Sequence, residues 1–123
     1  MKYINYNVDG YNCIERSLAK ILNTNCEVVK NNLEKIKEDL NSSNSNDIEV
    51  FEEYMNRNSI FPLSDKFDSK IKDLKLDDGE YVVFCYDKKD FYHMVTIIDN
   101  VLYDKSDESF DLYVIKIYKK FDN

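Results

Sequence analysis

The sequence is poor in the residues on which several common kinds of functional site depend. It has one histidine, one proline, two glycines and no tryptophan, and its three cysteines form no CxxC pair. A single histidine excludes a multi-histidine metal site, and two glycines leave no glycine-rich loop for a phosphate. An odd number of cysteines argues against a disulfide framework and against a zinc knuckle. We therefore predict free thiols, no bound metal and no cofactor.

The charge of the chain is unfavourable for binding nucleic acid. Acidic residues number 24 against 17 basic ones, which gives a net charge of −7, and the arginines are Arg16 and Arg57 alone. Few bidentate phosphate donors are therefore present. No apolar run approaches the roughly 18 residues of a membrane span, and residues 1–10 lack the basic and then apolar pattern of a signal peptide. We expect a soluble, cytoplasmic protein that binds neither nucleic acid nor membranes.

The hydrophobic pattern predicts helices in the first half of the chain. The 123 residues suffice for one core, so we expect a single domain over residues 1–123. Apolar residues recur at helical spacing in 12–23, 25–41 and 47–58. Asn12 and Glu15 resemble a capping box at the start of the first helix. Asp47 can cap the third helix, whose residue Ile48 is expected to face inward, and the polar stretch 41–46 reads as a loop.

The second half has the composition of β-strands. Residues 80–86, 91–98, 101–104 and 112–118 are rich in β-branched and aromatic side chains, and Pro62 is expected in a loop or an edge segment. Helices followed by strands predict an α+β domain in which the N-terminal helices pack on an antiparallel sheet of about four strands.

A predicted hairpin brings two polar residues of the sheet together. Asp99 and Asn100 tolerate positive φ and suit a two-residue turn, which places Ile98 opposite Val101. In this register His93 and Asp104 share one face as diagonal neighbours, with about 7 Å or less between their Cβ atoms. A carboxylate there can orient the imidazole. A structural histidine and a strand-end acid that faces solvent are the alternative interpretation.

Cys13 is the candidate nucleophile. It falls in the first turn of the first helix, where unpaired N–H groups and the helix dipole lower a thiol pKa. Taken alone, a cysteine at this position is more often a small apolar residue that packs in the core, and we expect that role for Cys26 and Cys85. A thiol, a histidine and an acid are together the groups that acyl transfer needs.

Several stretches resemble a known group of enzymes. The segment 10–19 (GYNCIERSLA), the segment 93–98 (HMVTII) and the pair Tyr103-Asp104 resemble small bacterial and phage papain-like cysteine peptidases, including bacteriocin-processing peptidases. The first segment is also similar to the N-terminal half of butirosin-type acyltransferases. The resemblance implies a papain-like fold with a catalytic triad of Cys13, His93 and Asp104.

The resemblance also implies an amide side chain ahead of the nucleophile, which helps the backbone N–H of the cysteine to bind the oxyanion. This amide is typically that of a glutamine. Asn7 stands six positions before Cys13, and Asn5 and Asn12 are possible substitutes. An ordinary loop residue is the alternative role for Asn7.

These observations together predict a thiol hydrolase that cleaves a peptide or isopeptide bond through an acyl-enzyme on Cys13. The partner would then be a peptide or protein substrate. An acyltransferase would use the same triad but pass the acyl group to an amine or alcohol. A third possibility is an acidic inhibitor or binding protein without catalytic activity, whose carboxylates occupy a basic partner surface.

Overall fold

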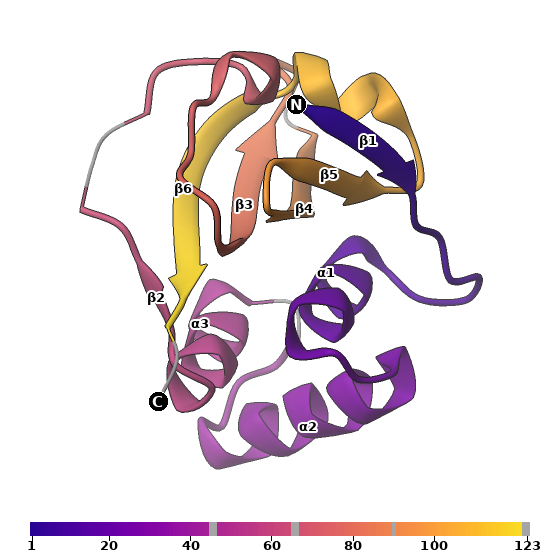
Figure 1. Cartoon of the computed structure of the whole chain (residues 1–123). Coiled ribbons are helices and arrows are strands. Elements are labelled where there is room, and N and C mark those ends of the chain that lie inside the picture. The colour runs from indigo at the N-terminus through magenta and orange to yellow at the C-terminus, as the bar shows by residue number, and fades with distance from the viewer. Residues whose placement is uncertain (45–46, 65–66, 90, 122–123) are drawn as a thin grey trace.

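The structure is a computed structural model that describes residues 1–44, 47–64, 67–89 and 91–121 (Figure 1). The elements are, in chain order, β1 (Lys2–Asn5), α1 (Cys13–Leu22), α2 (Cys26–Asp39), α3 (Ile48–Arg57), β2 (Ile60–Pro62), η1 (Ile71–Asp73), β3 (Glu80–Tyr86), β4 (Tyr92–Ile98), β5 (Val101–Asp104), η2 (Asp107–Asp111) and β6 (Tyr113–Lys120). No helix in these four ranges has the length and apolar character needed to cross a membrane.

The strands form one sheet in the order β1-β5-β4-β3-β6-β2, so the predicted α+β class is confirmed. The four expected strands are present as β3 to β6. The expectation of about four antiparallel strands is wrong, however, because the described residues form six and the sheet is mixed. β1 runs parallel to β5, and β2 adds a short antiparallel edge along β6. Pro62 lies in this edge strand, where its missing N–H costs no ladder hydrogen bond.

Local hydrogen bonds explain where the helices begin. The Asn12 side chain accepts from the Glu15 N–H at 2.9 Å, and the Glu15 carboxylate accepts from the Asn12 N–H at 3.0 Å, so the predicted capping box is present. Asp47 precedes α3 as expected but makes no capping bond with its side chain, which instead accepts a hydrogen bond from the Ser42 hydroxyl. Within the predicted loop 41–46, residues 45 and 46 lie outside the described part of the chain.

Both faces of the sheet are covered (Figure 1). The three helices pack on one face, and their core includes Leu18, Phe51 and Met94. On the other face, η1 and nearby chain segments pack over a second core that includes Ile71 and Val83. Strands β3 and β4 are buried over most of their length because each contributes alternate side chains to the two cores.

The start of β4, the end of β5 and the start of α1 meet at one end of the sheet. Asp99 and Asn100 both adopt positive φ, and Ile98 pairs with Val101, which confirms the predicted turn and register. The ladder between β4 and β5 covers residues 96–98 of β4, whereas the ladder between β4 and β3 continues to Tyr92. The first residues of β4 therefore have strand β3 on one side and helix α1 on the other. Chain segment 6–12 leads from the end of β1 to this helix.

Candidate active site

Cys13 is the first residue of α1, as predicted, and its side chain is half-buried. Helix N–H groups in the first turn have no partner within the helix, and the helix dipole there favours an anion. The capping box at Asn12 and Glu15 fixes the point at which the helix starts, and therefore the position of the sulfur.

Helix α1 takes the place of a neighbouring strand along the start of β4. The Met94 backbone interacts with the Cys13 side chain and helps to lower the pKa of its thiol, and the Met94 carbonyl accepts from Ser17 Oγ at 2.9 Å. Cys13 and Ser17 are four residues apart and so lie on the same side of the helix. Thr96 Oγ1 adds a bond of 2.9 Å to the Ser17 carbonyl. These buried contacts place Cys13 beside the strand that carries His93.

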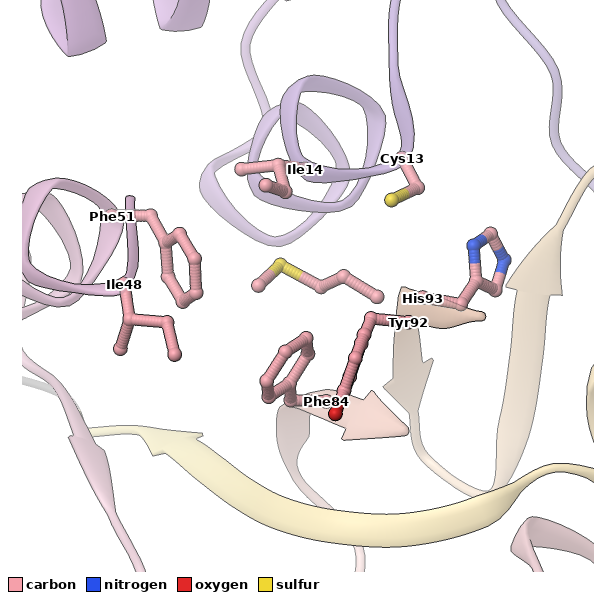
Figure 2. Close-up of a pocket in the computed structure, with 8 residues that line it drawn as sticks. Cys13, Ile14, Ile48, Phe51, Phe84, Tyr92 and His93 are labelled. Carbon is pink, nitrogen blue, oxygen red and sulfur yellow. The ribbon is translucent and has the colours of Figure 1, made fainter. Parts of the chain in front are cut away.

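His93 and Asp104 form a buried pair, as the hairpin register predicts. The His93 Nε2 atom lies 2.7 Å from Asp104 Oδ2, and both side chains are at most 7% exposed. The same carboxylate oxygen accepts a hydrogen bond from the Ser109 hydroxyl. Figure 2 shows the other ring nitrogen of His93 on the side of Cys13. The three predicted triad residues therefore lie in line, with the imidazole between the thiol and the carboxylate.

The electrostatics of this arrangement favour a charged Cys13–His93 pair. Burial opposes ionisation of the thiol, but a hydrogen bond with His93 and the charge of His93 outweigh it, so the pKa of Cys13 is lowered. Burial also opposes the charged imidazole, but hydrogen bonds with Asp104 and Cys13 raise the pKa of His93 to about 9. The pKa of Asp104 is lowered because the contacts with His93 and Ser109 outweigh the effect of burial. A thiolate beside an imidazolium is the reactive form of a cysteine nucleophile.

The other two cysteines have the opposite character. Cys26 and Cys85 are buried, and burial raises the pKa of each thiol. Cys85 lies opposite His93 in the sheet, and its thiol donates to the His93 carbonyl at 3.3 Å. Both fit the packing role expected from the sequence, and they serve as internal controls for Cys13.

Asn7, the predicted oxyanion residue, lies in an exposed part of the segment between β1 and α1. Its amide nitrogen donates to Asp9 Oδ1 at 3.2 Å, so this amide is held by a neighbouring carboxylate. The amide of Asn5 donates to the Lys105 carbonyl at 3.0 Å, and Asn12 caps the helix. The backbone N–H of Cys13, at the first position of the helix, is the donor closest to the sulfur along the chain.

A cavity of about 370 Å³ opens beside the sulfur of Cys13. Cys13 and His93 form one side of it, and apolar residues of α1, α3, β3 and β4 form the rest: Ile14, Ile48, Phe51, Phe84, Tyr92 and Met94. Figure 2 shows how these side chains surround the space. Ile48 was expected to face the core, but this expectation is wrong, because Ile48 is 51% exposed and lies at the wall of the cavity.

Sequence reasoning missed Ser109 and the role of α3 as a wall of the cavity. Ser109 belongs to an acidic stretch that reads as a solvated turn, and no residue pattern in that stretch indicates a contact with Asp104. Among the described residues, no three metal-binding side chains gather in one place. Comparisons of the chain with protein-family models, with curated proteins and with solved structures found no match.

Proposed function

We propose that the chain is a thiol hydrolase that cleaves a peptide or isopeptide bond through an acyl-enzyme on Cys13. One observation carries the proposal. A half-buried thiol at a helix start interacts with an imidazole whose far nitrogen lies 2.7 Å from a buried carboxylate. A cysteine that serves only to pack the core has no need of this chain of polar groups.

The first half of the reaction forms the acyl-enzyme. The Cys13 proton resides on His93, and the thiolate attacks the carbonyl carbon of the substrate to form a C–S bond. The carbonyl oxygen becomes an oxyanion, to which the Cys13 N–H donates. His93 then gives its proton to the leaving nitrogen as the C–N bond breaks. The products are a free amine and a thioester on Cys13.

The second half releases the acyl group. His93, now neutral, takes a proton from water while the water oxygen attacks the thioester carbonyl. Collapse of this intermediate breaks the C–S bond and restores the thiolate, and a carboxylic acid leaves. Throughout the cycle Asp104 holds His93 Nε2, so that the opposite nitrogen exchanges protons with the sulfur and the substrate.

The order of the elements supports a papain-like fold within the α+β class. In both the resembled peptidases and this chain, a cysteine opens a helix that packs on a sheet, and a histidine on a strand is followed by an acid. The mixed sheet and the parallel edge strand β1 are features of this chain that the resemblance does not imply.

The experiment that tests the proposal is cleavage of a defined peptide mixture, followed by mass spectrometry, with wild type and three variants. We expect wild type and Cys26→Ala to cleave the same bonds, and Cys13→Ala and His93→Ala to lose at least a hundredfold in rate while they keep the wild-type circular dichroism. Cleavage by Cys13→Ala at the wild-type rate would overturn the proposal. So would a wild-type protein that cleaves no peptide and forms no acyl adduct on Cys13 with an activated ester.

A further inference from the structure

The cavity beside Cys13 indicates the kind of acyl group that becomes attached to this cysteine. We infer that the acyl donor carries a bulky apolar group next to the reacting carbonyl, and that this group occupies the cavity lined by Ile14, Ile48, Phe51, Phe84, Tyr92 and Met94. The inference rests on the proposed function, because it concerns the group that becomes attached to Cys13. It goes further, because it names the chemistry of that group.

The lining of the cavity is mostly apolar. Among its described lining residues, the polar side-chain groups are the Cys13 thiol, the His93 imidazole and the Tyr92 hydroxyl. The first two belong to the reaction itself. A charged or strongly polar acyl group placed here would lose its hydration and find almost no hydrogen-bond partner, which is unfavourable. An apolar group gains by the same transfer.

The cavity lies directly beside the Cys13 side chain. Its wall includes the sulfur-bearing residue and Met94, whose backbone contacts Cys13. An acyl group bonded to the sulfur therefore has the cavity as its nearest enclosed space (Figure 2). The volume of about 370 Å³ is at the lower end of the range for small-molecule sites.

The rim of the cavity extends the apolar surface. Ile48 and Tyr92 are 51% and 56% exposed, so exposed apolar side chains border the cavity where it opens to the surface. Tyr92 stacks on Phe84 within the cavity and on Tyr86 beyond it, with ring centroids 5.8 Å and 6.2 Å apart. A ligand that extends beyond the cavity can pack against this row of aromatic rings.

Two sources of such a group share this chemistry, namely the hydrocarbon chain of a fatty acyl ester and the apolar side chain of a peptide. The test uses two series of p-nitrophenyl esters with the full-length protein. The first series is acetyl, butyryl and hexanoyl. The second is N-acetyl-glycyl, N-acetyl-leucyl and N-acetyl-phenylalanyl. Each rate of Cys13 acylation is divided by the rate of the same ester with free 2-mercaptoethanol.

We expect the normalised acylation rate to rise by up to about fourfold per methylene that enters the cavity, and by at least tenfold overall in one series. The series that shows the rise identifies the source. Rates that are flat in both series would overturn the inference. If acetyl ester still acylates Cys13 in that case, the proposed function survives, whereas absence of any Cys13 acylation would remove the proposed function as well.

Ile48→Asp tests the cavity directly. Ile48 is exposed and stands in the first turn of α3, where an acidic residue suits the helix dipole, so the substitution leaves the fold intact. We expect it to lower the normalised rate of the bulky ester, relative to that of the acetyl ester, by at least fivefold. Val28→Asp is the matched control, because Val28 is 42% exposed in the first turn of α2 and does not line the cavity. Equal effects of the two variants would contradict the inference.

Discussion

Thr96 Oγ1 donates a hydrogen bond of 2.9 Å to the carbonyl oxygen of Ser17. This bond joins the helix that begins with Cys13 to the strand that carries His93. Both residues are buried, and the Ser17 hydroxyl returns a bond to the Met94 carbonyl on the same strand. The distance between Cys13 and His93 is therefore set by contacts one turn of helix away from the chemistry.

The first prediction concerns the hydrogen bond between Thr96 and Ser17. Thr96→Val keeps the shape of the side chain but removes its hydroxyl, so we expect a loss of about 1 kcal/mol in the free energy of unfolding. We also expect slower alkylation of Cys13 at neutral pH, since the sulfur is less firmly held against His93. Urea denaturation and iodoacetamide kinetics measure the two effects. Thr24→Val, in the turn after α1, is the control and should leave the alkylation rate unchanged.

The second prediction concerns Ser109, which acts through Asp104 and is a positioning residue. Ser109→Ala removes one of the two hydrogen bonds that converge on Asp104 Oδ2. Because this bond helps to lower the pKa of Asp104, we expect its loss to raise that pKa, to move the acidic limb of the acylation profile to higher pH, and to reduce the rate of Cys13 acylation by about three- to tenfold. The pH profile of acylation shows both.

Ser106→Ala is the control for Ser109, because the Ser106 hydroxyl caps η2 by accepting from the Glu108 N–H at 3.1 Å. A purely structural role of the η2 segment would give the two variants the same pH profile. The account requires a shift in the Ser109 variant alone.

The third prediction concerns α3, which forms one wall of the cavity. The Tyr118 hydroxyl donates to Glu52 Oε2 at 2.6 Å and so ties α3 to β6. Tyr118→Phe leaves the carboxylate with the bond from Lys116 Nζ, and we expect a loss of about 1–2 kcal/mol in the free energy of unfolding, measured by urea denaturation. Tyr113→Phe, at the other end of β6, should cost less than half as much. Equal losses would show that the Glu52 contact does not stabilise the fold.

Much of the site could be predicted from the sequence because it depends on local interactions, namely a helix cap and a hairpin turn. The capping pair Asn12 and Glu15 fixes where the first helix starts, and the Asp99-Asn100 turn fixes the register of β4 against β5. That register is sufficient to place Asp104 beside His93. The contact between Cys13 and His93 was predicted only from the order of the groups and from the resemblance, since it depends on how the helix packs.

The features that the sequence did not predict depend on long-range packing. Strand β1 is four residues long and mostly exposed, so residues 2–5 lack the pattern of a buried strand, and their pairing with β5 decides their structure. Ile48 has the spacing of a core residue, but the start of α3 lies beside a cavity rather than above the packed sheet. Periodicity identifies the apolar face of a helix but not the space that this face covers.

The fourth prediction concerns the pH dependence of stability, in a Cys13→Ala background that removes the titration of the thiol. The pKa of Asp104 lies below its ordinary value of 3.8, so its contribution is present above that value and is lost as pH falls through the lowered pKa. Contact with Asp104 raises the pKa of His93 above its ordinary value of 6.5, so its contribution is complete below 6.5 and is lost as pH rises through the raised value.

We therefore expect Asp104→Asn to cost the most stability between about pH 4 and 6.5, and less both in stronger acid and in alkali. Urea midpoints from pH 2.5 to 10 measure this difference. Asp111→Asn, which alters an exposed carboxylate, is the control and should show no such maximum. A cost that is independent of pH would contradict the ionic character of the His93–Asp104 pair.

The most direct test of the account is the rate of iodoacetamide alkylation of Cys13 against pH, with the modified cysteine identified by mass spectrometry, in wild type and in His93→Ala. The account predicts that wild-type Cys13 reacts at neutral pH with a rate that titrates below the ordinary thiol pKa, and that His93→Ala moves this titration to higher pH. Cys26 and Cys85 should stay unreactive in both proteins. An identical pH profile for Cys13 with and without His93 would contradict it.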